Sequence, residues 1–144
     1  SEVLPFPAAI ASITPWTDLT LSGESYVTNN ELDPVLDRDS MIRYATAYAG
    51  ANDKRDPLIS PLFAEYTADF PPILIQTGTR DVLLSDCVRL HHQMKRGNVD
   101  AELSVYEGMW HGFHVIPNTE FPEAKTGFAE VAAFLNGILK SETR

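Results

Sequence analysis

The stretch that decides the fold is Ile73-Leu74-Ile75-Gln76-Thr77-Gly78-Thr79-Arg80-Asp81. Its first five residues form a short, mostly apolar run, which is typical of a strand buried inside a parallel sheet. Residues 8–13 form a similar run, and residues 101–106 alternate between apolar and polar like a third strand. The sequence therefore predicts three strands, and it predicts that the strand within residues 8–13 is buried on both faces.

Two helical patterns separate these strands. Asp37 or Asp39 can cap the first helix, and Gly50 can end it. Ser85 can cap the second helix, and Gly97 can end that one. Each helix therefore has both a start signal and a stop signal in the sequence.

A third helical pattern begins near Pro122. Its apolar residues recur at helical spacing along one stripe, at Phe128, Val131, Leu135 and Ile138. The chain thus reads strand, helix, strand, helix, strand, helix, an order that implies parallel strands with right-handed crossovers. We expect an α/β fold of about three parallel strands joined by crossover helices.

An acid and a histidine each follow a predicted strand, at Asp81 and His111. Parallel strands end on the same side of a sheet and neighbouring strands lie about 4.8 Å apart, so the two loops can meet. Imidazole is a good general base near neutral pH, and Gly108 and Gly112 permit a tight loop around His111. Alternatively, His111 lies on a surface loop and Asp81 is a turn residue. Their order on successive strands favours a catalytic pair.

Other residues with chemical potential have simpler interpretations. Asp86 lies in the first turn of its helix, where a negative charge favours the helix dipole. His114 is expected to be a packing or loop residue, with a role at the mouth of the site as the alternative. His91 and His92 are adjacent and point apart on a helix, so no metal site is expected there. Cys87 is expected to be a small buried residue.

A serine nucleophile is not evident in the sequence. No G-x-S-x-G motif occurs, although that strand-to-helix turn is how many hydrolases expose a reactive hydroxyl. The candidates Ser12, Ser60 and Ser85 lie in no such turn. The pair of Asp81 and His111 would therefore need a serine from elsewhere.

Charge and composition exclude several kinds of partner. A net charge of −9 argues against binding to nucleic acid and to anionic membranes. No apolar run approaches the roughly 18 residues of a membrane span. A single cysteine allows no internal disulfide and fits a reducing compartment, so we expect a cytoplasmic location.

Four segments together resemble the hormone-sensitive-lipase-like esterases, a group of bacterial carboxylesterases with the α/β-hydrolase fold. Residues 12–19 resemble the S-P-W-x-D-L segment of that group, and residues 56–62 its D-P-x-x-S-P-L segment. Residues 71–78 resemble the strand before its catalytic acid, and residues 106–113 its histidine loop. The segments occur in the family's order and cover most of the chain.

The resemblance implies hydrolysis of short to medium acyl esters through an acyl-serine intermediate, without a cofactor or a metal. His111 would take and return the proton, and Asp81 would orient His111. Trp16, Val82, Leu83 and Phe113 would line the substrate pocket. Packing in the core or at the rim is the alternative role for these four, and for Leu83 it is the favoured one.

The family's oxyanion motif and nucleophile turn are absent from residues 1–144. We therefore expect the chain to be the C-terminal segment of a single catalytic domain, with an N-terminal segment of the same hydrolase supplying the serine. Its first strand would then have an unpaired edge that favours a homo-oligomer. The alternative function is a catalytically inactive fragment that acts as a binding or assembly module. A hydrolase with a different nucleophile within this chain is a third hypothesis.

Overall fold

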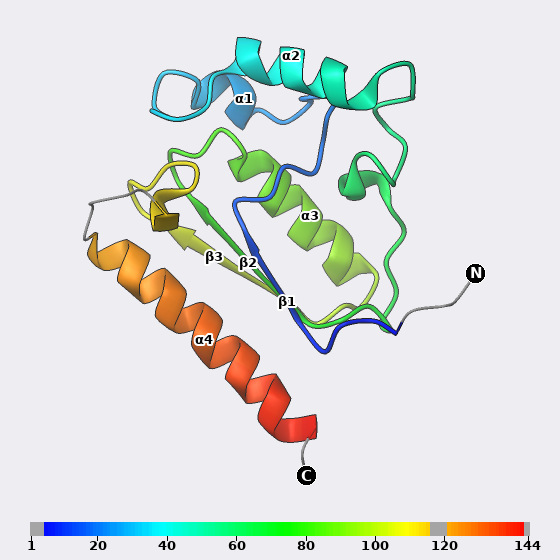
Figure 1. Cartoon of the computed structure of the whole chain (residues 1–144), viewed down its shortest axis with the longest axis vertical. Helices are drawn as coiled ribbons and strands as arrows, with labels where there is room; N and C mark the ends of the chain where they lie inside the picture. Colours follow the sequence, from blue (N-terminus) through cyan, green and yellow to red (C-terminus); the bar gives the residue numbers. More distant parts are fainter. Residues whose placement is uncertain (1–4, 116–120, 143–144) are drawn as a thin grey trace.

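The computed structural model describes residues 5–115 and 121–142, which form a parallel sheet flanked by helices (Figure 1). The strands are β1 (Ile10–Ile13), β2 (Ile73–Gly78) and β3 (Ala101–Tyr106), in the order β1-β2-β3. Ile73 of β2 pairs with Ile10 on one side and with Ala101 on the other. All three carboxyl ends therefore lie at the same end of the sheet, which confirms the predicted α/β arrangement.

The central strand carries the core. All six residues of β2 are buried, because strands flank it on both edges and helices cover both faces. Helix α3 (Leu84–Arg96) packs against β2 and β3, whereas α4 (Pro122–Glu142) contacts β1 and β2 (Figure 1). The larger apolar cluster lies between α3 and the sheet and includes Ile73, Ile75, Cys87, Leu90, Met94, Val99 and Ala101.

A further layer lies across the carboxyl ends of the strands. It consists of α1 (Ser25–Thr28) and α2 (Arg38–Ala49), drawn at the top of Figure 1. The Asp37 side chain accepts a hydrogen bond from the Ser40 amide at the start of α2, and Gly50 with φ 58° ends the helix. The signals predicted for this helix are therefore confirmed. A short 3-10 turn, η1 (Pro61–Phe63), follows in the long connection to β2.

The predictions for the burial of β1 and for the start of α3 are wrong. β1 is half-buried rather than buried on both faces, because it pairs only with β2 and its other edge has no strand among the described residues. Ser85 does not cap α3, which begins at Leu84. The Ser85 hydroxyl instead accepts a hydrogen bond from the Ser25 amide at 3.0 Å, and the Ser25 hydroxyl accepts one from the Ser85 amide at 2.9 Å. These two bonds join α1 to α3.

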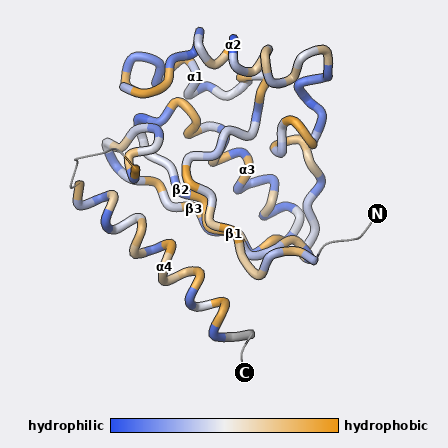
Figure 2. The backbone as a smooth tube through the Cα atoms, in the orientation of Figure 1, coloured by the Kyte–Doolittle hydropathy of each residue, from blue (hydrophilic) through white to orange (hydrophobic). Residues whose placement is uncertain are grey.

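Helix α4 begins at Pro122 as predicted and is amphipathic, with hydrophobic and hydrophilic residues alternating along it in Figure 2. Val131, Leu135 and Ile138 are half-buried, but Phe128 of the predicted stripe is exposed. The buried positions near the start of the helix are Ala124 and Gly127. Glycine avoids a close contact at position 127, since a Cβ there would lie 2.7 Å from Nε2 of His114.

A half-buried polar cluster attaches α4 to the sheet. The Glu130 carboxylate accepts hydrogen bonds from Gln76 Nε2 at 2.6 Å, Ser104 Oγ at 2.5 Å and Tyr106 Oη at 2.7 Å. Burial by itself would raise the pKa of Glu130, but these three donors outweigh it and lower the pKa below its ordinary value. The ionised carboxylate therefore stabilises the contact between α4, β2 and β3.

We predict that Glu130→Gln lowers the free energy of unfolding by about 1–3 kcal/mol at pH 7, because the amide offers one acceptor oxygen to three donors. The pKa of Glu130 is depressed in the folded chain, so its contribution is present above the unfolded pKa of about 4.3. The contribution is lost as the pH falls through the folded pKa. Urea unfolding at pH 7 and pH 3 measures both effects. The control is Glu102→Gln, at an exposed position. An equal loss of unfolding free energy in Glu130→Gln and in this control would contradict the prediction.

A second carboxylate, Asp86, forms hydrogen bonds with the backbone that follows β1. Its side chain is fully buried, and Oδ2 accepts the backbone N–H groups of Thr17 and Asp18, each at 2.8 Å. The sequence predicts for Asp86 only a favourable position at the helix dipole. Its carboxylate also joins α3 to the backbone of residues 17–18. Burial raises the pKa of Asp86 to about 6 despite these hydrogen bonds.

We predict that Asp86 makes the chain less stable as the pH rises from about 4 to about 6. Over that range the folded chain keeps a proton that the unfolded chain, with a pKa near 3.9, has already lost. Asp86→Asn removes this titration and keeps an acceptor oxygen. Relative to this variant, the wild type should lose up to about 3 kcal/mol between pH 4 and pH 7 in chemical denaturation. If the free energies of unfolding of the wild type and of Asp86→Asn changed by the same amount with pH, the prediction would be contradicted.

Candidate active site

Asp81 lies in the turn after β2 with its carboxylate fully buried. The hydroxyl of Thr77 donates a hydrogen bond to Oδ2 at 3.0 Å, and the backbone N–H of Leu83 donates to Oδ1 at 2.8 Å. Each carboxylate oxygen thus has a donor from a fixed part of the fold. The orientation of the side chain is set before any histidine approaches it.

His111 lies in the loop after β3, between Gly108 and Gly112. These glycines have φ values of 74° and 65°, in the left-handed region that other residues rarely adopt. The loop turns His111 toward Asp81, and its Nδ1 lies 3.5 Å from Asp81 Oδ1. The side chain keeps 24% of its surface exposed although Nδ1 itself is buried, so the exposed part is the rest of the ring.

The sequence prediction that these two loops meet is correct in geometry. The distance of 3.5 Å is slightly longer than an ideal hydrogen bond, and Nδ1 has no other partner among the described residues. A small closing movement would give a bond from Nδ1–H to the carboxylate. Catalytic hydrogen bonds are often long in the absence of substrate, so the separation is compatible with an acid–histidine pair.

Backbone contacts fix the two loops against each other. Thr79 N donates to Tyr106 O at 3.0 Å, Arg80 N donates to Met109 O at 2.9 Å, and Gly108 N donates to Thr79 Oγ1 at 2.8 Å. Gly78 allows this close approach, because a Cβ there would lie 2.1 Å from the carbonyl oxygen of Met109. The approach of Asp81 and His111 thus follows from the way their loops pack.

Three of the four residues expected to line a substrate pocket are buried inside the chain. Val82 and Leu83 are 0% and 1% exposed and pack in a cluster with Tyr26 and Met41. Phe113, in the 3-10 turn η2 (Phe113–Val115), is fully buried, with its ring centroid 3.7 Å from that of His114. Within this chain these three side chains pack in the interior, and their contact with a substrate stays a prediction.

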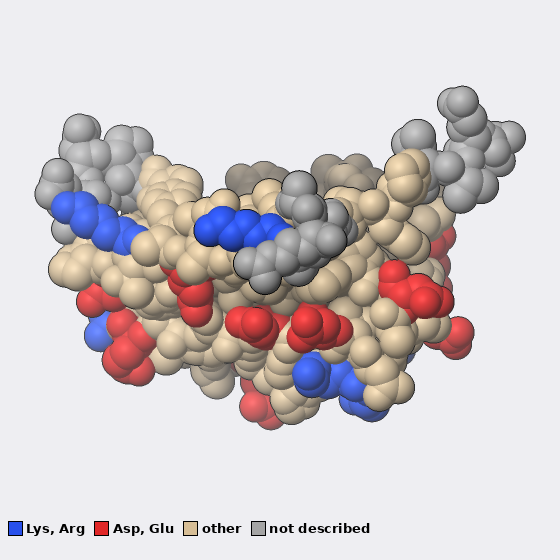
Figure 3. Space-filling view, turned by 90° about the horizontal axis from the view of Figure 1, so that it is seen from below, with Lys and Arg blue, Asp and Glu red and all other residues tan. Residues whose placement is uncertain are grey.

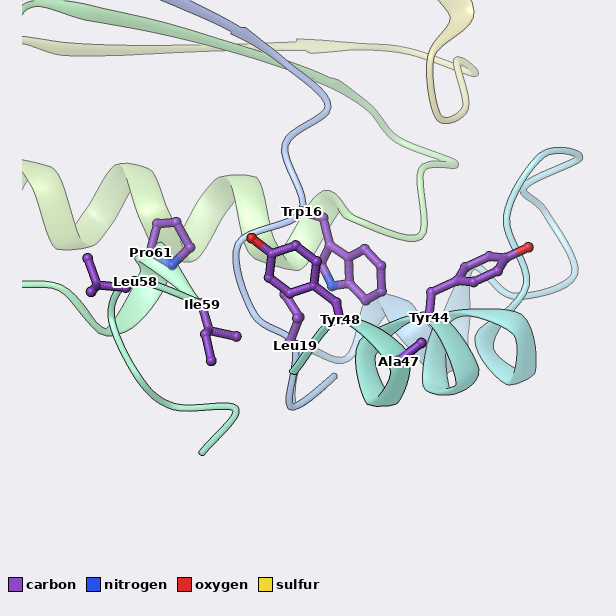
Figure 4. Close-up of a pocket in the computed structure, with 8 residues that line it drawn as sticks. All are labelled: Trp16, Leu19, Tyr44, Ala47, Tyr48, Leu58, Ile59 and Pro61. Carbon is purple, nitrogen blue, oxygen red and sulfur yellow. The ribbon is translucent and has the colours of Figure 1, made fainter. Parts of the chain in front are cut away.

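Trp16, the fourth of these residues, lines an apolar groove of about 640 Å³. Figure 4 shows the rings of Trp16 and Tyr48 at the centre of the group, with Leu58 and Pro61 to one side and Tyr44 to the other. The remaining lining residues are Leu19, Ala47 and Ile59. Neither Asp81 nor His111 lines this groove, so the groove and the acid–histidine pair are separate features of the described chain.

His114, His91 and Cys87 pack against other parts of the chain, and the expected burial of Cys87 is confirmed. His114 is buried with Nε2 3.0 Å from Gln76 Oε1, and burial lowers its pKa. His91 is half-buried and contacts the Ala101 carbonyl, whereas His92 is exposed. Cys87 is fully buried, which raises the pKa of its thiol. Within residues 5–115 and 121–142, no group of three His, Cys, Asp or Glu side chains could hold a metal ion.

Two of the three candidate serines, Ser60 and Ser85, form hydroxyl hydrogen bonds elsewhere in the chain. Ser60 is fully buried, and its hydroxyl donates to the Lys54 carbonyl and accepts from the Leu19 amide. The Ser85 hydroxyl accepts the Ser25 amide, and Ser12 lies in β1. In the part of the chain that the structure describes, no serine hydroxyl forms a hydrogen bond with His111.

Two residues near the pair were not singled out from the sequence. Asn29 Nδ2 donates to the carbonyls of Asp81 at 2.8 Å and Thr79 at 3.2 Å. Asp33 accepts backbone N–H groups from both site loops, at Val82 and His111. The sequence offers only a weak signal for either, because both lie in a polar loop of the kind where Asn and Asp are common.

The surface carries mixed charge. Figure 3 shows one face on which Asp and Glu side chains are spread among neutral residues, while Lys and Arg occur in small separate groups. Among the described helices, none is both long enough and apolar enough to span a bilayer.

Comparison with known proteins places the chain in a family. A family model described as the alpha/beta hydrolase fold matches residues 1–115. An esterase of Acinetobacter venetianus is 32% identical over 133 residues, which cover 92% of this chain and 43% of the relative. An acetyl-hydrolase of Streptomyces hygroscopicus is 32% identical over 134 residues, which cover 91% of this chain and 43% of the relative.

A solved structure is also similar to this chain. The crystal structure of an esterase from the bacterial hormone-sensitive lipase family matches with a TM-score of 0.87 and 34% identity, over 93% of this chain and 44% of that one. The chain thus spans less than half the length of these relatives. The resemblance carried by the four sequence segments is confirmed: the chain belongs to the α/β-hydrolase fold family and is similar to its hormone-sensitive-lipase-like esterases.

Proposed function

We propose that this chain supplies the acid and the base of a serine carboxylic ester hydrolase. The observation that carries the proposal is the 3.5 Å approach of His111 Nδ1 to the buried carboxylate of Asp81, beyond the carboxyl ends of neighbouring parallel strands. That end of a parallel sheet is where α/β enzymes bind their ligands. The relatives named esterase and acetyl-hydrolase support the same class of reaction.

In the proposed reaction a serine hydroxyl attacks the ester carbonyl while His111 takes its proton. Since Nδ1 faces Asp81, Nε2 is the nitrogen left to act as the base. The proton then passes from His111 to the departing alcohol, and water releases the acyl group by the same steps. Asp81 keeps the ring in one tautomer and stabilises the imidazolium form. No cofactor and no metal take part.

The serine and the oxyanion donors come, in this proposal, from an N-terminal segment of the same hydrolase, either covalently joined or associated. Two observations support it: the absence of a G-x-S-x-G turn, and a chain that covers 43% of its esterase relative. The edge of β1 that pairs with no strand among the described residues offers a place for a further strand. The same edge would permit a homo-oligomer.

The proposed substrates are small esters with short to medium acyl groups. The acetyl-hydrolase relative supports short acyl groups. Of the four expected substrate contacts, Trp16 lines a groove, although neither Asp81 nor His111 lines it. Val82, Leu83 and Phe113 would act by shaping the site, because they are buried in this chain. We also propose a cytoplasmic location, which the single buried cysteine supports.

The alternative function is a binding or assembly module without catalysis. The observation that favours it is the combination of a free β1 edge with an open apolar groove that contains exposed Tyr48 and Leu58. Such surfaces commonly contact other proteins. In that case Asp81 and His111 would serve only to order their loops.

Substitution of the pair distinguishes the two functions. In the hydrolase assembled with its serine-bearing segment, Asp81→Asn should lower kcat for a p-nitrophenyl acyl ester by about 10³–10⁴-fold, because an amide cannot hold the correct tautomer. His111→Gln should lower it at least as much. The matched controls are Asp69→Asn and His92→Gln, both at exposed positions, which should change kcat less than about 2-fold. Unchanged ester hydrolysis in Asp81→Asn and His111→Gln would reject the proposed roles.

A further inference from the structure

We infer that Asp33 is a positioning residue that holds Asp81 and His111 in register, an inference that rests on the function proposed above. Asp33 lies in the connection between α1 and α2, outside both site loops, and is 8% exposed. Its carboxylate is the acceptor that the two loops share.

One oxygen of Asp33 bridges the two loops. Oδ2 accepts the backbone N–H of Val82 at 3.0 Å and that of His111 at 3.3 Å. Val82 follows Asp81 directly, so this oxygen fixes the backbone beside the acid and the backbone of the histidine itself. A displacement of either loop would break one of the two bonds. The bridge therefore limits how far His111 can move from Asp81.

The other oxygen anchors the bridge. Oδ1 of Asp33 accepts the backbone N–H groups of Val35 at 2.9 Å and Leu36 at 3.2 Å, within its own turn. Four backbone donors thus converge on one carboxylate. Hydrogen bonds to an ionised acceptor are stronger than those between neutral groups. Among the described residues no Lys or Arg forms an ion pair with Asp33, so the backbone donors are its partners.

The same connection also contacts the carbonyl side of the acid loop. Asn29, at the end of α1, donates through Nδ2 to the Thr79 and Asp81 carbonyls. Asn29 therefore satisfies acceptors of the loop while Asp33 satisfies donors of both loops. Figure 1 shows this layer lying across the strand ends, where the two loops emerge. The α1–α2 connection thus helps to fix the positions of Asp81 and His111 relative to each other.

The inference predicts an effect on the chemical step rather than on substrate affinity. A displacement of about 1 Å at a catalytic centre can cost on the order of 100-fold in rate. Asp33→Asn keeps the size of the side chain but gives one of the two oxygen positions an NH₂ group, which repels backbone N–H donors. We expect Asp33→Asn and Asp33→Ala to lower kcat about 10- to 100-fold with KM changed less than about 3-fold.

The matched control is Asp37→Ala in the same connection. Asp37 is also a carboxylate that accepts a backbone amide, from Ser40, but it caps α2 and forms no hydrogen bond with either site loop among the described residues. Its loss should lower the melting temperature and leave kcat within about 2-fold when the assay runs well below that temperature. An equal loss of kcat in Asp33→Asn and Asp37→Ala would overturn the inference, since general destabilisation would then explain both.

A second measurement needs no serine. Nitrogen-15 NMR of His111 in the 144-residue chain reports which ring nitrogen carries the proton. The wild type should hold the Nδ1–H form that faces Asp81, and Asp33→Asn should give a mixture of both forms. The inference is overturned if Asp33→Asn keeps the wild-type tautomer, or if the wild type itself is a mixture. An assembled wild-type protein without esterase activity would contradict the proposed function, and the tautomer would still decide the role of Asp33.

Discussion

The parallel pairing of β2 with β3 is the constraint on which the site depends. The register runs from Ile73 opposite Ala101 to Gly78 opposite Tyr106, so both strands end at the same level. Each then turns into a loop, and backbone bonds such as Arg80 N to Met109 O join the loops. Asp81 and His111 are consequently brought within 3.5 Å although 30 residues separate them in the sequence. An antiparallel pairing would place them at opposite ends of the sheet.

Buried carboxylates organise the loops around this end of the sheet. Asp86 holds the backbone after β1, Asp81 is fixed by Thr77 and Leu83, and Asp33 joins the two site loops. Backbone N–H groups are donors in all three cases. Loops at the end of a sheet have many unpaired amides that need acceptors, and a carboxylate can satisfy several at once. Some of the chain's acidic residues therefore act as buried hydrogen-bond acceptors rather than as surface charges.

The sequence predicted those parts of the fold that local signals determine. β2, β3 and α2 were predicted because an apolar run, an alternating run and a pair of caps are visible within a few residues. The burial of β1 was mispredicted because it depends on whether a strand lies on its other side. Likewise, the Ser85 hydroxyl bonds to Ser25, 60 residues away, which no local pattern indicates.

The residues of the candidate site fall into the same two groups: those that local signals indicate, and those whose contacts lie far away in the sequence. Asp81 and His111 could be predicted to lie close together because each follows a strand in a recognisable segment. Asn29 and Asp33 could not, because their partners are backbone groups 49 to 78 residues away, and backbone groups leave no trace in a sequence. Val82, Leu83 and Phe113 were expected at a pocket, yet their apolar side chains pack into this chain's interior. An apolar residue beside a site residue does not reveal which way it faces.

We propose that Asp81 and His111 activate a serine that lies outside these 144 residues. Mass spectrometry after reaction with a fluorophosphonate, which labels activated serines covalently, can locate that serine. We expect an adduct on a serine of the associated N-terminal segment, and a loss of labelling in His111→Gln. An adduct on a serine of this chain, or labelling that persists in His111→Gln, would contradict it.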